Sequence, residues 1–343
     1  MSQNLSPQAA ASEATFLGLI RRQLTKPKPL PAGINLTGQV AIVTGSNTGL
    51  GLESCRQLLA LGLSQLVMGV RSQAKGDEAA AKLRKEFPLA DATITVWVVD
   101  MESYDSVRDF TAKCATLPRI NIAILNAGLA KLKYTTVSST GHETVLQVNY
   151  LSTVLLAILL LPILKARKPA GTPAVLSIVG SDAMYSSPIK ADKGVSVFSQ
   201  FDVPDGYSSM AWYSRTKVLL AFFVYQLAQH VDPDDVIINV SNPGATGGTD
   251  IARLLPWILQ KIVILIQYFV ARPVGVGASV YLDAVFAEGK QSHGGFVSDW
   301  AIKPFPPLWY TDDGKDFSQR LWQETLQELE VTEATLKELK SYD

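Results

Sequence analysis

Cysteine and histidine are scarce in this chain, and neither sign of charge is in excess. The 343 residues include two cysteines and three histidines, and the histidines stand singly, apart from the cysteines. A zinc site needs several such ligands close together, so no metal site is expected. The chain carries 31 basic and 31 acidic residues, a formal net charge of +0, and no basic tract. Without a strong positive field, nucleic acid is not an expected partner.

The scarcity of cysteine also bears on the compartment. A chain with so few cysteines is typical of a reducing environment, so Cys55 and Cys114 are expected to be free thiols. We expect Cys55 to lie on a buried helix and Cys114 on a surface helix. The start of the chain has neither the basic region nor the long apolar run of a secretory signal. Together these features predict a cytoplasmic location.

One long uncharged stretch resembles a membrane span. Residues 144–164 carry no charged side chain and are long enough to cross a bilayer. They include Gln147 and Asn149, and Pro162 is expected to end the helix that they form. A helix buried between a sheet and a neighbouring helix explains this composition better than a membrane span does.

Short apolar runs alternate with helical segments from residue 40 onwards, and 47% hydrophobic residues suffice for a large core. Strands are predicted at residues 40–44, 65–70, 94–99, 121–125, 174–179, 236–240 and 295–297. Helices are predicted at residues 50–61, 75–86, 103–115, 141–164 and 212–230. This alternation predicts an α/β fold, a Rossmann-type doubly wound parallel sheet of about seven strands with helices on both faces.

We expect a single domain with extended loops. Residues 38–303 contain the alternating pattern, including a long loop at 245–272. Residues 1–37 are expected to form an N-terminal arm on the domain surface, with a short docked helix that begins at Phe16. Residues 304–343 form a C-terminal extension, whose amphipathic stretch 317–339 is expected to dock on the same domain.

A glycine-rich turn follows the first predicted strand and opens the first predicted helix. Gly45 permits the tight turn, Gly49 lets the backbone approach a pyrophosphate, and Gly51 lets the helix pack closely on the sheet. Free N–H groups at the start of the helix suit phosphate oxygens. The predicted phosphate-binding residues are Gly45, Ser46, Asn47, Thr48, Gly49, Leu50 and Gly51. An ordinary glycine turn is the structural alternative, and only residues downstream decide against it.

The residues after the second strand predict which dinucleotide binds. An NAD site usually has a carboxylate here, which binds the ribose 2′-hydroxyl. This chain has Arg71 instead, with Ser72 and Lys75 nearby, and a guanidinium suits a 2′-phosphate. NADP(H) is therefore the expected cofactor, and a solvated loop charge is the alternative interpretation of Arg71.

Further cofactor contacts are expected where the third and fourth strands end. Asp100, which precedes Met101, is placed to bond the adenine amino group. The small residues of Asn126-Ala127-Gly128 leave room for the cofactor ribose. Because the carboxyl ends of parallel strands meet at one edge, these residues are expected to line one site.

A pair of residues on one predicted helix indicates acid–base chemistry. Tyr213 and Lys217 are four residues apart and so share a helix face. The lysine ammonium is expected to lower the pKa of the Tyr213 phenol, so that Tyr213 exchanges a proton with a substrate oxygen near neutral pH. Lys217 would also hold the nicotinamide ribose.

Two polar residues complete this predicted centre. Ser181 would hydrogen-bond a substrate carbonyl, and Asn149 would hold a water that links Lys217 to solvent. Each residue alone has a structural explanation: packing for Tyr213, a cap or turn for Ser181, and a bond to buried backbone for Asn149. Their joint occurrence in this order favours the catalytic interpretation.

This ordered set resembles the short-chain dehydrogenase/reductase family, and within it the branch of retinol dehydrogenases, WW-domain oxidoreductases and related fungal enzymes. The resemblance spans residues 38–300 and rests on Thr44–Gly51, Asn126–Gly128, Asn149, Ser181, Tyr213, Lys217 and Asn242–Gly244. It implies a catalytic tetrad of Asn149, Ser181, Tyr213 and Lys217.

The resemblance also implies contacts on the nicotinamide side. Pro243, Gly244 and either Thr246 or Thr249 would close over the nicotinamide amide, while Tyr213 and Lys217 would touch the cofactor as well as the substrate. The family usually has a serine pair where this chain has Gly180-Ser181, and Ser181 still matches the catalytic position. Ser177 is the weaker candidate, because it lies inside a predicted strand.

Two long inserts are expected to shape a pocket for an apolar small molecule. The first spans residues 182–211. The second includes the strongly apolar stretch 254–270, in which Lys261 is the only charge. We expect a lid there; peripheral membrane contact, a subunit interface and ordinary packing are the alternatives. The predicted helices 141–164 and 212–230 pair subunits in many relatives, so a homo-oligomer is a further expectation.

The predicted function is an NADP(H)-dependent oxidoreductase. It would move a hydride reversibly between the cofactor and a ketone, aldehyde or alcohol on an apolar small molecule. The resemblance to fungal enzymes adds a biosynthetic tailoring step as the expected context. Two other classes stay open: a non-redox enzyme on the same scaffold, such as an epimerase, dehydratase or cyclase, and a protein that senses NADP(H) without catalysis.

Overall fold

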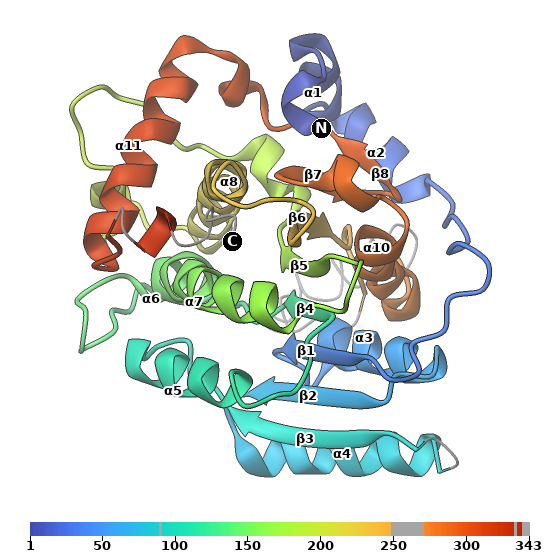
Figure 1. The fold of residues 1–343 in the computed structure, drawn as a ribbon. Helices are drawn as coiled ribbons and strands as arrows, with labels where there is room; N and C mark the ends of the chain where they lie inside the picture. Colours follow the sequence, from blue (N-terminus) through green and yellow to red (C-terminus); the bar gives the residue numbers. More distant parts are fainter. Residues whose placement is uncertain (89–90, 248–270, 333–334, 338–343) are drawn as a thin grey trace, which may run out of the picture.

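One eight-stranded sheet forms the centre of the molecule (Figure 1). The computed structural model describes residues 1–88, 91–247, 271–332 and 335–337. The strand order is β3-β2-β1-β4-β5-β6-β7-β8, and all neighbouring strands are parallel except β7 and β8. The strands are β1 (Val40–Thr44), β2 (Gln65–Val70), β3 (Thr93–Val98), β4 (Ile122–Leu125), β5 (Ala174–Val179), β6 (Val236–Asn242), β7 (Gly295–Ser298) and β8 (Ala301–Lys303). The predicted doubly wound α/β fold is therefore confirmed.

Helices cover both faces of this sheet (Figure 1). One face carries α5 (Tyr104–Cys114), α7 (Ser152–Arg167) and α8 (Ser209–Ala228). The other carries α3 (Gly49–Ala60), α4 (Gln73–Glu86) and α10 (Val274–Phe286). Each face has its own hydrophobic core; β1, β4 and β6 are buried throughout, and β5 is buried except at its last residue, Val179. Burial on both sides explains why these strands are continuous apolar runs rather than alternating ones.

The doubly wound topology gathers the predicted site at one edge of the sheet. Gly45, Arg71, Asp100, Asn126 and Ser181 each lie within two residues of the end of a parallel strand. Parallel strands point the same way, so residues distant in sequence converge there.

One strand was not predicted. The sheet has eight strands where about seven were expected, and the additional strand is β8 (Ala301–Lys303). It is only three residues long and half-buried, which leaves almost no periodicity to detect. Cys114 lies on a helix with an exposed outer face, as expected, but its thiol is fully buried, because the face of α5 that it shares with Val107 and Phe110 packs into the core. Both cysteines are free, as predicted.

The predicted helix 141–164 begins and ends three residues later than expected and is less regular. It consists of α6 (Thr144–Leu146), the π-helix η2 (Gln147–Leu151) and α7, which continues to Arg167. Pro162 lies inside α7 and does not end it. Its side chain is exposed, whereas Leu160, Leu161 and Leu164 around it are buried, so core packing outweighs the lost hydrogen bond.

This same helical stretch is the only one among the described residues that is long and apolar enough to cross a membrane. In Thr144–Arg167, 94% of the most apolar window is buried inside the protein. The prediction of a buried core helix is therefore confirmed.

The N-terminal arm forms helices that pack at the β7–β8 end of the sheet (Figure 1). α1 (Pro7–Glu13) is followed by α2 (Phe16–Leu24). The short docked helix exists, but its orientation is the reverse of an ordinary amphipathic helix: Phe16 and Leu17 are exposed, while Arg22 and Gln23 are buried. Its docking therefore depends on polar contacts rather than on an apolar face.

The C-terminal extension docks as expected. α11 (Asp312–Glu328) buries Phe317 and Leu321 against the α8 side of the core. Trp322 stacks on Phe223 with ring centroids 4.8 Å apart. The extension thus completes the hydrophobic layer over α8.

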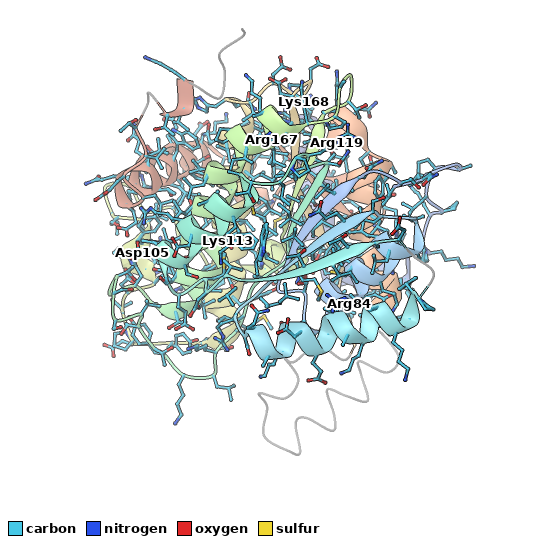
Figure 2. The ribbon with its side chains drawn as sticks, turned by 60° about the horizontal axis from the view of Figure 1, so that its bottom comes forward. Arg84, Asp105, Lys113, Arg119, Arg167 and Lys168 are labelled. Carbon is cyan, nitrogen blue, oxygen red and sulfur yellow. The ribbon has the colours of Figure 1, made fainter. Side chains whose placement is uncertain are left out.

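Surface charge is mixed, in keeping with the zero net charge. Figure 2 shows Arg84 on α4 and Asp105 and Lys113 on α5, and all three residues are exposed. An exposed ion pair such as Arg108–Asp105 contributes little to stability. Buried charges are concentrated elsewhere, at the carboxyl ends of β5 and β6.

Candidate active site

The glycine turn after β1 has the geometry of a phosphate cradle. Gly45 (φ +62°) and Gly49 (φ +56°) adopt backbone conformations that L side chains rarely take. A Cβ on Gly49 would have no atom within 4 Å, so the space beside it is open. The side chain of Thr48 does not cap α3, which leaves the first N–H groups of the helix available to a ligand.

Gly51 has the predicted packing role. A Cβ there would stand 2.4 Å from the Gly45 carbonyl oxygen and 2.5 Å from Asn126 Nδ2. No side chain fits in that space, so glycine lets α3 approach the turn. The side chain of Ser46 is buried beside β2, where its Oγ lies 3.4 Å from the Gly69 carbonyl oxygen.

Asn126 ties the glycine turn to the next strand. Its Nδ2 donates to the carbonyl oxygens of Thr44 (3.1 Å) and Gly45 (3.2 Å), and its Oδ1 accepts from the Tyr281 hydroxyl at 3.3 Å. The Ala127 N–H donates to Thr44 Oγ1 at 3.1 Å. Asn126 therefore holds the cradle in shape. The sequence predicted only that a small residue at this position leaves room for the cofactor ribose.

The charged residues after β2 are open to solvent. The side chain of Arg71 is 69% exposed, and its Nη1 lies 3.6 Å from Glu102 Oε1. Lys75 is exposed and Ser72 half-buried. A long, weakly held guanidinium can turn toward an incoming anion at low cost.

Asp100 and Met101 follow β3, beside Arg71. Asp100 Oδ1 accepts from the Glu102 N–H at 3.0 Å, which fixes the turn. Met101 is buried in the core. Asp100 is half-buried, so the structure leaves part of its carboxylate accessible at the sheet edge.

The structure brings Ser181, Tyr213 and Lys217 together. The Ser181 and Tyr213 side chains face each other, close enough for Ser181 to affect the pKa of Tyr213, and Ser181 Oγ accepts from the Ala183 N–H at 3.2 Å. Lys217 Nζ donates to the Val179 carbonyl oxygen at 2.8 Å and lies 5.4 Å from the centre of the Tyr213 ring. One hydroxyl pair thus faces the site, with an amine behind it.

The expected lowering of the Tyr213 pKa is wrong for this structure. Burial raises the pKa of Tyr213, the Ser181 side chain only partly opposes this, and the charge of Asp182 raises it further. Burial also lowers the pKa of Lys217, to about 8. Both groups lose hydration when buried, so each favours its neutral form more than spacing along a helix suggests.

Asn149 makes contacts that position the centre. Its Oδ1 accepts from the Leu129 N–H and its Nδ2 donates to the Leu129 carbonyl oxygen, both at 2.8 Å. Nδ2 also lies 3.5 Å from Thr216 Oγ1, on the helix that carries Tyr213 and Lys217. The structural alternative, a bond to buried backbone, is therefore present, in a residue that sits within the π-helix η2.

The turn after β6 forms the other wall of the site. Gly244 has φ +73°, and Thr246 Oγ1 donates to its carbonyl oxygen at 3.1 Å. Of the two threonines considered, Thr246 lies at this turn, next to Pro243, and Thr249 is outside the described residues. The predicted lid at 254–270 is also outside them.

The first insert contributes mainly to the core. Phe198 and Phe201 are buried in the hydrophobic cluster rather than lining a cleft. Met184 and Tyr185 line a small cavity of about 170 Å³, together with Ser187, Ile189, Val218 and Pro306–Leu308. This mostly apolar space begins three residues after Ser181.

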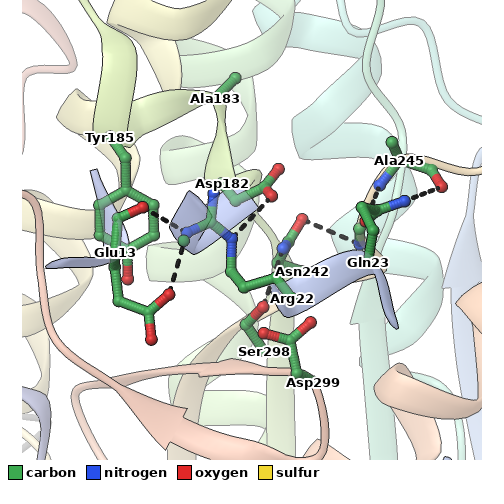
Figure 3. A network of polar contacts seen from close by, with 12 residues as sticks. Glu13, Arg22, Gln23, Asp182, Ala183, Tyr185, Asn242, Ala245, Ser298 and Asp299 are labelled. Atoms are coloured by element: carbon green, nitrogen blue, oxygen red, sulfur yellow. Dashed lines mark hydrogen bonds and ion pairs between the residues drawn. The ribbon is translucent and has the colours of Figure 1, made fainter. Parts of the chain in front are cut away.

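Sequence analysis missed a buried polar network next to this site (Figure 3). Arg22 and Gln23 come from α2, Arg272 precedes α10, and Asp299 follows β7. Their partners are up to 250 residues away in the sequence, and no local motif marks them. Only the folded structure reveals that they meet.

Comparison with known proteins agrees with the fold. The family model described as short chain dehydrogenase matches residues 39–189. The short chain dehydrogenase virL of Hypocrea virens is 55% identical over 337 residues, which cover 98% of this chain and 97% of that protein. The short chain dehydrogenase/reductase mfmJ of Annulohypoxylon moriforme is 44% identical over 307 residues, which cover 89% of each chain.

Solved structures share the fold at low sequence identity. An NADPH-bound short chain oxidoreductase of Pseudomonas aeruginosa PAO1 has a TM-score of 0.59 and 21% identity, with 77% of this chain and 95% of that chain covered. The RhlG/NADP complex of Pseudomonas aeruginosa has a TM-score of 0.58 and 20% identity, with 81% and 98% covered. The fold alone does not establish the family, but the similarity to fungal relatives over nearly the full length does. The chain belongs to the short-chain dehydrogenase/reductase family of oxidoreductases.

Proposed function

We propose that this protein is an NADP(H)-dependent reductase that converts a ketone or aldehyde on an apolar small molecule to an alcohol. The observation that carries the proposal is the juxtaposition of the Ser181 and Tyr213 side chains, with Lys217 on the next helical turn, at the edge where the glycine cradle opens. The pair supplies two hydroxyls for one substrate oxygen.

The residues of the cradle fit a dinucleotide. The uncapped start of α3 and the open space at Gly49 suit a pyrophosphate. The exposed Arg71 guanidinium, with Lys75 nearby, suits a 2′-phosphate. When bound, NADPH supplies the hydride for the reduction. Two structural relatives were solved with NADPH or NADP, which supports this choice of cofactor.

Tyr213 is proposed to act as the general acid. Its raised pKa keeps the phenol protonated at neutral pH, so it has a proton to give to an oxygen that gains negative charge. Ser181 donates a second hydrogen bond to the same oxygen. The proposed preference for NADP(H) favours reduction as the working direction.

Lys217 and Asn149 are proposed to support this proton transfer. Lys217 is held by the Val179 carbonyl and faces the Tyr213 ring, so its charged form stabilises negative charge on the phenol. Asn149 holds the Leu129 backbone and reaches Thr216, which fixes the helix beside Lys217.

The remaining expectations concern context. We propose a biosynthetic tailoring step, a suggestion that the fungal relatives support, and a cytoplasmic location. A homo-oligomer and peripheral membrane contact through 254–270 remain proposals, and the second concerns residues outside those described.

The test compares Tyr213→Phe with the wild type and with Tyr225→Phe, a control on the same helix. Each protein is mixed with NADPH and a panel of apolar ketones and aldehydes, and the alcohol product is detected by mass spectrometry. We expect Tyr213→Phe to bind NADPH normally but to lose roughly 10²- to 10⁴-fold in turnover, while Tyr225→Phe keeps it. Full turnover by Tyr213→Phe would rule out this role, and a wild type that does not bind NADPH would rule out the function.

A further inference from the structure

The second N-terminal helix, α2, is joined to both walls of the candidate active site by buried polar contacts (Figure 3). Arg22 and Gln23 are consecutive residues at its end, 3% and 6% exposed. Arg22 reaches the turn after β5, and Gln23 reaches the turn after β6. These are the turns that carry Ser181 and the Pro243–Thr246 segment.

Arg22 fixes the turn after β5. Its Nε donates to Asp182 Oδ2 at 3.1 Å, and Asp182 directly follows Ser181. Its Nη1 donates to the carboxylate and backbone carbonyl of Glu13, and the guanidinium lies 4.9 Å from the centre of the Tyr185 ring. These contacts hold the guanidinium in one position beside Asp182.

Gln23 fixes the turn after β6. Its Nε2 donates to the Ala245 carbonyl oxygen at 2.9 Å, and its Oε1 accepts from the Ala245 N–H at 3.0 Å. With these two hydrogen bonds, the Gln23 amide pairs with the Ala245 backbone as a residue of a neighbouring β-strand would. A Cβ on Gly244 would stand 2.7 Å from both Gln23 Oε1 and Arg272 Nη1, so the turn and the clamp fit each other closely.

Arg272 joins the two contacts. It donates to the Pro243 carbonyl oxygen at 3.1 Å, to Asp299 Oδ1 at 2.6 Å and to the backbone carbonyl of Arg22. Its guanidinium is 4.8 Å from the centre of the Trp300 ring. Arg272 thus holds the end of α2 in place, while Arg22 and Gln23 of α2 hold the two turns.

Stability alone is a weak reason for this arrangement. Buried ion pairs often contribute little net stability, because the charges lose their hydration. They do fix geometry, since one buried polar group tolerates few alternative partners. In this molecule the geometry fixed is that of the turns after β5 and β6, the first of which carries Ser181 beside Tyr213.

We propose that α2 is part of the catalytic apparatus, with Arg22 as a positioning residue for the Ser181–Asp182 turn and Gln23 as a positioning residue for the Pro243–Ala245 turn. The Arg22 half stands on geometry alone. The Gln23 half rests on the proposed function, because it assumes that the nicotinamide lies against that turn.

Arg22 also compensates a charge. Asp182 lies close enough to Tyr213 to raise the pKa of the phenol, so a cation paired with Asp182 limits that effect. The groups that face Tyr213 are Lys217 on its own helix, Ser181 and Asp182 after β5, and Tyr281 on α10. Those that face Asp182 are Arg22, Arg272 and Asp299.

The first experiment measures the pKa of Tyr213 by ¹³C NMR of tyrosine-labelled protein, with Tyr213→Phe to assign the signal. We expect Arg22→Met to raise the Tyr213 pKa by about 1, and Asp182→Asn to lower it by a similar amount. Arg22→Lys should stay near the wild type, because it keeps the charge. Arg21→Met is the matched control: Arg21 is the neighbouring residue, is 58% exposed and pairs only with Glu13 among the ion pairs described.

The Arg22 half is overturned if Arg22→Met leaves the Tyr213 pKa unchanged, whatever Asp182→Asn does. A general loss of structure would not reproduce opposite shifts in two variants and rescue by lysine. Where Arg22→Met does not fold, Arg22→Gln takes its place, because Asp182→Asn alone tests the charge of Asp182 and not the part played by Arg22. No step of this experiment depends on a substrate or on the cofactor.

The second experiment measures the affinity of Gln23→Leu and Gln23→Glu for NADPH and for adenosine 2′,5′-bisphosphate, which lacks the nicotinamide. We expect a roughly tenfold loss of NADPH affinity in both variants, with the bisphosphate unaffected. Equal NADPH affinity in wild type and variants overturns the Gln23 half. A wild type that binds the bisphosphate and NADPH equally well, or binds neither, contradicts the proposed function instead.

Discussion

The cofactor side and the reaction side of this sheet edge are built in opposite ways. On the cofactor side, Gly45, Gly49 and Gly51 leave backbone groups and space, and Arg71 is exposed. On the reaction side, Lys217 is 5% exposed and the nearby Arg22 is 3% exposed, each held by fixed acceptors. The cofactor side therefore offers free backbone groups and open space to a ligand. The reaction side instead has side chains that hydrogen bonds hold in one position.

This difference predicts how each side responds to mutation. Residues of the cofactor side act through short stretches of chain, so their effects should be separable. Residues of the reaction side share partners across the whole fold, so their effects should be coupled. The following predictions test this contrast, beginning with the largest expected effect.

Removal of the serine hydroxyl should damage the reaction side most. We expect Ser181→Ala to lower turnover by roughly 10²- to 10³-fold, because the substrate oxygen loses one donor. Ser177→Ala is the control: Ser177 is buried in β5 and donates to Ser241 Oγ at 2.9 Å. It should cost stability, about 1–3 kcal/mol, and leave turnover largely intact. The opposite pattern in turnover assays would assign the reaction to Ser177.

Two alanine substitutions should separate packing from ligand space on the cofactor side. Gly51→Ala places a Cβ 2.4 Å from a carbonyl oxygen and should lower the free energy of unfolding by about 1–3 kcal/mol. Gly49→Ala meets no atom within 4 Å, so its main cost should be in NADPH affinity, apart from about 1–2 kcal/mol for its positive φ. Urea unfolding and nucleotide titration measure the two effects. Equal losses in both variants by both measures would mean that the glycines share one role.

The exposed guanidinium after β2 should select the dinucleotide. We expect Arg71→Ala to weaken NADPH binding by roughly ten- to a hundredfold and to leave NADH binding unchanged. Arg108→Ala provides a control, since Arg108 is also exposed and lies 3.6 Å from a carboxylate, Asp105. Calorimetric titration of both variants measures the effect. An equal loss for NADPH and NADH would place the 2′-phosphate elsewhere.

The smallest effect concerns a polar contact that joins the first insert to α11. His142 Nδ1 lies 2.8 Å from Asp202 Oδ2, and Nε2 lies 3.2 Å from Glu328 Oε1. Burial lowers the pKa of His142, but the hydrogen bond to Asp202 and the two carboxylate charges outweigh it, so the net pKa is raised. The contribution to stability is therefore fully present below the unfolded pKa of about 6.5 and is lost as pH rises through the higher folded value.

Urea unfolding at about pH 6 and about pH 9 checks this prediction. The difference in unfolding free energy between the wild type and His142→Gln should shrink at the higher pH. A difference that is the same at both pH values would show that the charge of His142 does not stabilise the fold.

Much of the fold could be predicted because its signals are local. The bounds of β2 and β5 match the predicted runs 65–70 and 174–179, since each is an apolar stretch ended by polar or turn residues. The glycine turn could be predicted for the same reason. The continuation of α7 past Pro162 could not, because it depends on the burial of neighbouring leucines.

The site divides in the same way. Ser181, Tyr213 and Lys217 could be named from spacing and order, and the structure places them together. The direction in which the Tyr213 pKa shifts could not be predicted from the sequence, because desolvation depends on everything packed around the ring. Arg22 and Asp182 are 160 residues apart, and no sequence pattern links them.

The central claim is that this edge of the sheet binds NADP(H), and calorimetric titration of the wild-type protein with NADPH and with NADH tests it most directly. We predict saturable NADPH binding with a Kd in the micromolar range, roughly tenfold or more tighter than that of NADH. Binding of neither nucleotide, or tighter binding of NADH, would contradict the account.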